Sequence, residues 1–284
     1  MTTMLVIGFD SAWSGNNSGA IVGALRKDDG SYMHLGDPRK ANFDEATKNI
    51  EAWKEKYKPG ITLILIDQPI IVKNEAGQRP VENIVSSPVS KRYGGVQPAN
   101  RGKVGMFGND APIWDFLKNF GELSDPTKKP LPTNCVIETY PVIALIAMDW
   151  LLDDNHPNPR ATGRLPKYNT ERPSFFHGDW QFVCNQAADG FKKIGLWNLV
   201  KWLEEARDNP SPRKQLQDRL DACLCLLVGL HLMEGRDCLF VGNMESGYMV
   251  APYGGRLHEE LEVRFGRSQL MGNAADWIRK FNIS

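Results

Sequence analysis

The clearest pattern in the chain is a set of three short apolar runs, each followed at once by an acidic residue. The runs cover residues 4–9, 61–66 and 135–137, and the acids are Asp10, Asp67 and Glu138. Unbroken apolar runs of this length are typical of β-strands that are buried on both faces of a sheet. Because an ionised carboxylate at the end of such a strand is costly to desolvate, it needs a partner or a metal. The repeated arrangement makes these acids the first candidates for a functional site.

The pattern around these runs predicts the remaining elements. Two strands joined by the turn residues of 27–30 are expected at 20–25 and 31–35. Apolar residues recur at helical spacing in five further segments, which are 43–57, 111–120, 142–152, 190–207 and 213–234. Late in the chain we expect strands at 237–241 and 247–251 and a last helix at 274–281.

This order of elements predicts a single α/β domain over residues 1–284, built on a mixed five-stranded sheet flanked by helices. Two stretches, roughly 70–132 and 153–189, carry little periodicity and much Gly, Pro and Asn, so we expect them to be irregular insertions. Ligands of such sheets bind at the carboxyl ends of the parallel strands. The three strand-end acids are expected to meet there.

Composition narrows the class of protein. With 284 residues and 42% hydrophobic residues the chain can bury a large core, and its formal net charge of zero gives no overall field that would attract nucleic acid. The five cysteines form no CxxC pair, which favours a reducing, cytoplasmic location over a disulfide framework. No apolar stretch approaches the roughly 20 residues of a membrane span, so we expect no membrane partner.

Two more acids lie on the predicted helix 213–234. Asp218 and Asp221 are three residues apart, share one helix face and precede the apolar stretch 222–230. Carboxylates that converge in a low-dielectric cleft repel one another, and Mg²⁺ or Mn²⁺ relieves that repulsion because both ions prefer oxygen ligands. Two such ions about 4 Å apart activate water and stabilise the leaving oxygen in phosphodiester cleavage.

Each acid also has a structural interpretation. Asp10 could cap the turn that follows it, and Glu138 could cap the helix that starts after Pro141. Asp67, which precedes Gln-Pro, could be a structural residue at the point where the strand passes into a turn. Asp218 is equally suited to a solvated helix face, paired with Lys214 or Arg219. Asp221 is harder to explain in this way, since it leads a buried stretch.

The spacing of these residues resembles a domain-of-unknown-function family of predicted nucleases with the ribonuclease H-like fold. The motifs are Gly8-Phe-Asp10-x-Ala-Trp13, Ile66-Asp67-x-Pro69, Arg79-Pro-x-Glu82, Ile137-Glu138-x-Tyr-Pro141 and Asp218-x-x-Asp221-Ala222, within about residues 4 to 255. The resemblance implies metal ligands from the first strand, the fourth strand and a late helix. Here those are Asp10, Asp67 and Asp221, with Asp218 and Glu138 as added acids and Asp10, Asp67, Glu138 and Asp221 as the catalytic set.

The first insertion carries a local concentration of positive charge. Its cations are Lys73, Arg79, Lys91, Arg92, Arg101 and Lys103, and Tyr93 and Phe107 lie among them. Contact with phosphates and stacking on bases is one interpretation, with Arg79, Arg92, Arg101 and Lys103 as substrate-binding residues. A solvated loop whose cations balance Glu75 and Glu82 is the other.

The sequence thus predicts a nuclease, a hydrolase that needs Mg²⁺ or Mn²⁺ and acts on nucleic acid. An alternative is a phosphotransferase of the actin and sugar-kinase type, although Asp10 lacks the glycine-rich phosphate loop of that class. The third alternative is a non-catalytic module that binds nucleic acid or protein.

Overall fold

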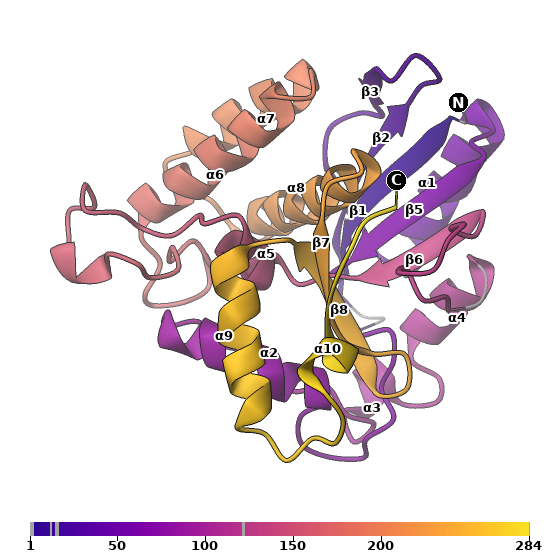
Figure 1. Cartoon of the computed structure of the whole chain (residues 1–284). Helices are drawn as coiled ribbons and strands as arrows, with labels where there is room; N and C mark the ends of the chain where they lie inside the picture. The colour runs from indigo at the N-terminus through magenta and orange to yellow at the C-terminus, as the bar shows by residue number, and fades with distance from the viewer. Residues whose placement is uncertain (1–2, 12, 15–16, 121–122, 284) are drawn as a thin grey trace.

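Figure 1 shows the computed structural model of the chain, in which residues 3–11, 13–14, 17–120 and 123–283 are described. A six-stranded mixed sheet lies at its centre. The strands are β1 (Met4–Asp10), β2 (Gly19–Arg26), β3 (Tyr32–His34), β4 (Arg39–Ala41), β5 (Ile61–Ile66) and β6 (Asn134–Glu138). They are ordered β3-β2-β1-β5-β6, and β4 pairs with β2. β1, β5 and β6 are parallel, whereas β2 is antiparallel to β1.

The helices lie between and after these strands along the chain. They are α1 (Phe43–Tyr57), α2 (Pro80–Lys91), α3 (Val104–Phe107), α4 (Pro112–Asn119), α5 (Pro141–Ala147), α6 (His177–Lys192), α7 (Trp197–Arg207), α8 (Lys214–Met233), α9 (Gly255–Gly266) and α10 (Ala274–Trp277), with a 3-10 turn η1 at Pro159–Ala161. Asn42 caps α1: its side-chain oxygen accepts a hydrogen bond from the backbone N–H of Glu45, and its own backbone N–H donates one to the Glu45 carboxylate.

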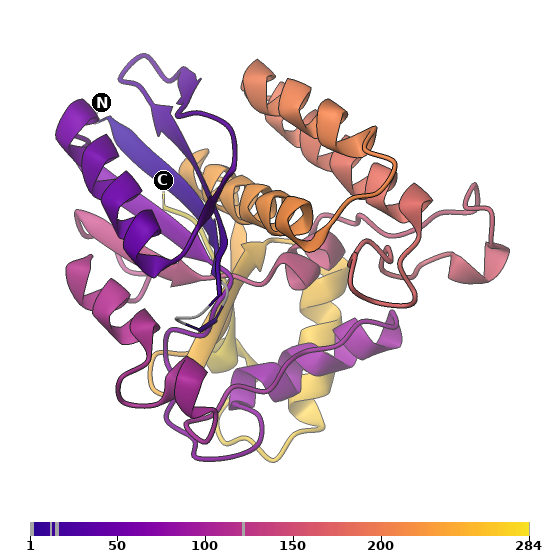
Figure 2. The same cartoon turned by 180° about the vertical axis from the view of Figure 1, so that it is seen from behind.

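The central sheet is covered on both faces. The apolar helix α8 lies across β1 and β5 on one face, with α6 and α7 outside it, and α1 and α4 cover the other face (Figures 1 and 2). Phe9 of β1 marks the second face, because its ring lies 5.6 Å from that of Phe43 and 5.4 Å from that of Phe116. Burial on both faces explains why β1 is apolar up to Asp10 and why β5 is apolar except for Thr62.

A second, three-stranded antiparallel sheet stands beside the carboxyl edge of the first. Its strands are β7 (Cys238–Asn243), β8 (Gly247–Pro252) and β9 (Ile278–Phe281), in the order β8-β7-β9. A parallel bridge between Thr139 and Val250 joins the end of β6 to β8. Helices α2, α5 and α9 pack around this junction, so the carboxyl edge of the central sheet is enclosed by later parts of the chain.

The predicted mixed α/β sheet is confirmed, but its count of five strands is short by one. The additional strand, β4, is only three residues long and two of them are cationic, so it shows no apolar run. The predicted strands at 237–241 and 247–251 are present, and they belong to the separate second sheet.

Several helix predictions need correction. The first insertion is not irregular at 80–91, because α2 lies there with Pro80 in its first turn and Pro88 inside it. The helix expected at 190–207 is two helices, of which α6 already begins at His177, inside the second expected insertion. The expected last helix ends at Trp277 and continues as β9, which is paired with β7.

Two further findings concern the cysteines and the apolar character of the helices. All five cysteines are free and buried. Within the described parts of the chain, no helix combines the length and the apolar character that crossing a membrane requires.

Candidate active site

The acidic residues that follow β1 and β5 share one face of the central sheet. Side chains alternate between the two faces of a strand. Gly8 of β1 lies directly under α8, so Asp10, two residues later, is on the α8 face as well. Leu65 of β5 packs against Gly229 of α8, which places Asp67 on this face too. The parallel register of β1 and β5 sets the two carboxylates next to each other at the carboxyl edge of the sheet.

Gly8 brings α8 close enough to add a third carboxylate. A Cβ atom at this position would lie 2.1 Å from the carbonyl oxygen of Ala222 and 2.4 Å from the nitrogen of Leu226, so only glycine fits beneath the helix. Asp221 directly precedes Ala222 and lies at this crossing, where it is buried with 7% of its surface exposed. The close contact between β1 and α8 therefore places Asp221 near Asp10.

These carboxylates are held in an unfavourable electrostatic environment. Burial raises the pKa of Asp10 well above its ordinary range, and Asp221, Asp67 and Asp218 raise it further. Burial likewise raises the pKa of Asp67, with Asp221 as the next cause. The pKa of Asp221 is raised to about 6 by burial, against the lowering effect of Lys214 and of two hydrogen bonds. Asp10, Asp67, Asp218 and Asp221 are called the acid cluster below.

Lys214 is the cation that compensates part of this charge. It begins α8, one turn before Asp218, and its ammonium group forms an ion pair with the carboxylate of Asp218. Its charge also lowers the pKa of Asp10, Asp67 and Asp221, so it acts on the whole acid cluster. Four carboxylates against one ammonium group leave the cluster with excess negative charge when all are ionised.

Tyr168 and Gln217 fix the carboxylate of Asp221. The Tyr168 hydroxyl donates a hydrogen bond of 2.8 Å to Oδ1, and Nε2 of Gln217 donates one of 3.2 Å to Oδ2. Gln217 lies one helical turn before Asp221, a spacing that the sequence displays. Tyr168 lies 53 residues away in the Pro-rich second insertion, and no local pattern identifies it. Asp10 and Asp67, by contrast, accept no side-chain hydrogen bond from any other described residue.

Glu138 lies on the opposite face of the sheet. The register pairs Ile66 with Glu138, and paired residues of parallel strands point to the same side, so Glu138 follows Ile66 and not Asp67. The residue aligned with Asp67 is Thr139, whose hydroxyl donates to the carbonyl oxygen of Val250. A shift of one residue in the strand therefore separates Glu138 from the acid cluster, although its charge still raises the pKa of Asp67 after burial and Asp221.

Arg79 neutralises Glu138 in a buried network. Its guanidinium donates bonds of 2.9 and 2.5 Å to the two oxygens of Glu138 and one of 2.8 Å to Glu82. Backbone N–H groups of Ile70 and Ala99 complete the carboxylates of Glu138 and Glu82. Burial lowers the pKa of Arg79, but the two glutamates more than offset this and hold it above its ordinary value. Arg79, Glu82 and Glu138 are called the arginine cluster below.

The cations proposed to contact substrate are placed differently from one another. Arg79 is fully buried, and its guanidinium donates to Glu82, Glu138 and the carbonyl oxygen of Ile71. Arg92 is 3% exposed and is held by Glu260 through bonds of 2.6 and 3.0 Å. Arg101 is half-buried, bonds to Asn109 and stacks 5.5 Å above Trp114, while Lys103 caps α3 and is half-buried. None of the four contacts the acid cluster among the described residues.

An unpaired amide lies beside the acids. Gln68, next to Asp67, is fully buried, and its Oε1 accepts a hydrogen bond from the hydroxyl of Ser11, next to Asp10. Its Nε2 has no hydrogen-bond partner in the described structure. Trp13 supports the same junction from the first loop by donating a 2.7 Å bond to the carbonyl oxygen of Asp67. A buried donor without a partner is rare in proteins, which favours a polar ligand at this position.

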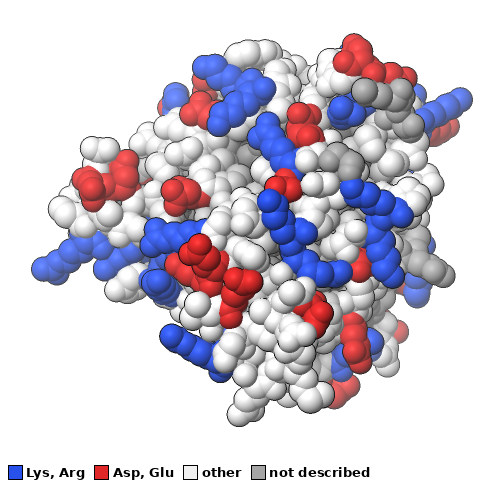
Figure 3. All heavy atoms as spheres, in the orientation of Figure 1, with Lys and Arg blue, Asp and Glu red and all other residues white. Residues whose placement is uncertain are grey.

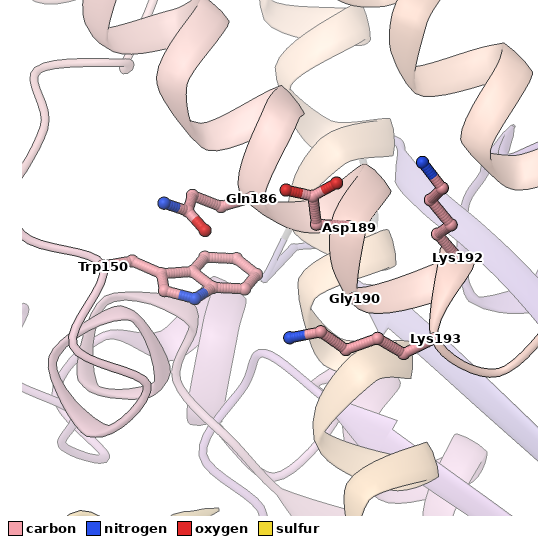
Figure 4. Close-up of a pocket in the computed structure, with 6 residues that line it drawn as sticks. All are labelled: Trp150, Gln186, Asp189, Gly190, Lys192 and Lys193. Carbon is pink, nitrogen blue, oxygen red and sulfur yellow. The ribbon is translucent and has the colours of Figure 1, made fainter.

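Two surface pockets lie away from these acids. One, with a volume of about 370 Å³, is bounded by Trp150 and the last turns of α6, where Gln186, Asp189 and Lys193 surround it (Figure 4). The other lies between α6 and α7. Neither is lined by a member of the acid cluster.

The donor chemistry of the acid cluster fits a hard divalent cation, because buried, mutually repelling carboxylates are the ligands that Mg²⁺ and Mn²⁺ prefer. Acids that already form an ion pair within the protein are less available to bind a metal ion. Glu138 is occupied by Arg79 and Asp218 by Lys214, which leaves Asp10, Asp67 and Asp221 of the five predicted ligands. Across the residues that the structure describes, no three or more His, Cys, Asp or Glu side chains are already spaced to hold an ion.

Comparisons with known proteins place the chain in a family. No curated protein and no solved structure matches it. A family model described as "Protein of unknown function (DUF429)" matches residues 8–245, a span that includes the end of β1, all of β5, β6 and α8, and hence the whole acid cluster. On this match over most of its length, the chain belongs to the DUF429 family.

Proposed function

We propose that the protein is a divalent-metal-dependent phosphodiester hydrolase, a nuclease with a ribonuclease H-like fold. The observation that carries this proposal is the convergence of three carboxylates from two parallel strands and a crossing helix: Asp10 and Asp221 are buried, and Asp67 is partly exposed. Asp221 raises the pKa of both other acids. Such mutual repulsion between carboxylates destabilises a fold unless a bound cation neutralises their charge.

The topology supports the same proposal. The path β3-β2-β1-β5-β6, with three parallel strands followed outward by two antiparallel ones, is consistent with the sheet that the sequence resemblance implies. In that fold the metal ligands come from the first strand, the fourth strand and a late helix. When the five strands of this path are counted along the chain, the fourth is β5. Asp10 on β1, Asp67 after β5 and Asp221 on α8 occupy these places.

In this proposal each group has a distinct role. Asp10, Asp67 and Asp221 hold the metal, and Tyr168 and Gln217 keep Asp221 oriented. Bound Mg²⁺ or Mn²⁺ supplies a Lewis acid that activates water and stabilises the leaving oxygen. The free N–H of Gln68, buried next to Asp67, is an additional hydrogen-bond donor at this edge. Lys214 adds positive charge at the same edge.

One observation favours a second candidate, a non-catalytic binding module. Lys214 already pairs with Asp218 and acts on the other three acids, so an internal cation takes part of the role of a metal. This candidate predicts ligand binding that is insensitive to EDTA and to Asp10→Asn.

The proposal is tested by hydrolysis of short, fluorescently labelled DNA and RNA oligonucleotides in Mg²⁺ and in Mn²⁺. We expect cleavage that EDTA stops and that Asp10→Asn and Asp67→Asn abolish. The matched control is Asp115→Asn, which removes an exposed carboxylate on α4 and should leave the rate unchanged. Metal-dependent cleavage that survives in both cluster variants would contradict the assignment. Binding without cleavage, unaffected by EDTA, would favour the binding module.

A further inference from the structure

An exposed aromatic ring and an arginine are stacked together after the end of α2. Tyr93 is 60% exposed, and the guanidinium carbon of Arg164 lies 3.9 Å from the centre of its ring. Arg164 comes from the second insertion, and its guanidinium makes no hydrogen bond to any described residue. One side of the tyrosine ring is therefore covered by a cation with free donors, and the ring remains largely open to solvent.

Short connections join this stacked pair to the acid cluster. Lys167 donates from Nζ to the carbonyl oxygen of Tyr93 at 2.5 Å, and the next residue, Tyr168, donates to Asp221. The backbone of Leu165 also bonds to that of Arg92 at 3.1 Å, which fixes the insertion along the end of α2. The partner of the Tyr93 carbonyl and the partner of Asp221 are thus adjacent residues in the chain.

A second connection comes from the other side of the cluster. The Tyr140 hydroxyl donates a 2.6 Å bond to the carbonyl oxygen of Gly95, two residues after Tyr93. Burial raises the pKa of Tyr140, and the charges of Asp67 and Asp221 raise it further, so its ring lies within electrostatic reach of the acid cluster. Tyr93 is therefore held on the rim of the acidic site by two independent contacts.

The backbone at Tyr93 is locked in an uncommon conformation. Its φ of 61° lies in the left-handed region, which large side chains rarely adopt. Gly94 follows, and a Cβ there would lie 2.6 Å from the side chains of both Leu165 and Val89, so the insertion packs directly on this turn. The surrounding contacts thus hold the ring outward at some expense in backbone energy, a situation that is concentrated at ligand-binding sites.

We propose that Tyr93 and Arg164 form a platform that binds single-stranded nucleic acid at the mouth of the acid cluster. An unpaired base stacks on the open part of the tyrosine ring, and Arg164 contacts the adjacent phosphate. This inference rests on the proposed nuclease function and names its substrate class. Duplex bases have no free face for such stacking. On the face in Figure 3, Lys and Arg side chains are interspersed with Asp and Glu, as expected from the zero net charge, which does not favour a long duplex backbone.

The test is fluorescence anisotropy with a labelled dT12 strand, an rU12 strand and a DNA duplex of equal length, in EDTA so that no hydrolysis occurs. Tyr93→Asn removes the ring and keeps a residue that tolerates the left-handed backbone. We expect it to weaken single-strand binding by about 5- to 100-fold, the range of one lost base stack, whereas Tyr93→Phe keeps the affinity. Arg164→Gln should lower the slope of log affinity against log salt by about 0.7.

The matched control is Trp197→Ala, which removes another exposed aromatic ring, 58% exposed, from α7 on the far side of α6. It should bind as the wild type does. Unchanged binding in Tyr93→Asn, an equal loss in Trp197→Ala, or tighter binding of duplex than of single strands would overturn the platform. Failure of the nuclease proposal has a different signature, namely single-strand binding through Tyr93 with no cleavage in any metal. If cleavage occurs and Tyr93→Asn leaves its KM unchanged, the platform fails and the nuclease stands.

Discussion

The acid cluster and the arginine cluster are two groups of buried carboxylates at the same edge of one sheet, and they are treated in opposite ways. In the arginine cluster a guanidinium and backbone N–H groups meet the carboxylates of Glu138 and Glu82. In the acid cluster Asp10 and Asp67 receive no such donors among the described residues, and neighbouring carboxylates add to the effect of burial.

The two clusters differ in how the charge of the acids is compensated within the fold. Burial raises the pKa of Glu138, but Arg79 and the N–H of Ile70 oppose that rise. For Asp10 the three next causes after burial all raise the pKa in the same direction. A fold gains nothing in stability from such an arrangement, so it is best explained by a cation or substrate that the acids bind.

The largest expected effect comes from breaking the arginine cluster. Arg79→Met removes the only cation that pairs with the two fully buried glutamates among the described residues, and we expect it to lower the free energy of unfolding by about 3 to 5 kcal/mol. Urea denaturation monitored by circular dichroism measures this. The control is Lys118→Met, which breaks an exposed ion pair with Asp115 and should change stability by less than about 1 kcal/mol. A loss for Arg79→Met as small as that of the control would show that the arginine cluster does not stabilise the fold.

Removing a charge from the acid cluster should raise the free energy of unfolding, whereas removing the charge of Arg79 should lower it. The folded-state pKa of Asp10 lies above its ordinary value of 3.8, so the stability gained by holding a proton is present at low pH and is lost as pH rises through the folded pKa. In EDTA at pH 8, Asp10→Asn should therefore raise the free energy of unfolding by about 1 kcal/mol or more, the repulsion between two charges 4 Å apart in water. Near pH 4 the gain should shrink. A loss of stability at pH 8 would mean that Asp10 has a favourable partner.

A smaller effect is expected at Lys214. Its ammonium group competes with any other cation for the acid cluster, and its side chain is 45% exposed, so the interaction is partly screened. Lys214→Met should tighten Mn²⁺ binding several-fold, equivalent to about 1 kcal/mol, and Lys214→Arg should leave it near the wild-type value. Titration calorimetry at constant pH provides the measurement. Weaker binding in Lys214→Met would indicate that Lys214 orders the acids more than it competes with the ion.

The central part of this architecture follows from the sequence because its signals are local. Apolar runs that end in Asp10 and Asp67 predict buried parallel strands, and the spacing of Asp218 and Asp221 predicts a shared helix face. Helix α2 was not predicted, because its prolines and serines interrupt the helical spacing of its apolar residues. Predictions that depended on composition alone, such as the irregular insertions, are the least accurate.

The separation of the two clusters could not be predicted from local pattern. Glu138 ends a strand just as Asp67 does, and only the register between β5 and β6 reveals that it faces the other way. Tyr168 reaches Asp221 across 53 residues from a Pro-rich segment without periodicity. Arg79 and Arg101 are both arginines in the same predicted insertion, so the sequence does not tell them apart. They differ in the tertiary structure, where Arg79 is fully buried and Arg101 is half-buried.

The central claim is that the acid cluster binds a divalent cation, and Mn²⁺ titration calorimetry at pH 8 tests it most directly. The wild type and an Asp10→Asn/Asp221→Asn double variant are compared, with Asp115→Asn as a matched control, each with and without a short oligonucleotide. We expect one or two ions to bind the wild type and the control with micromolar to millimolar affinity, and none to bind the double variant. If the wild type takes up no ion even with the oligonucleotide present, or if the double variant binds as well as the wild type, the account is contradicted.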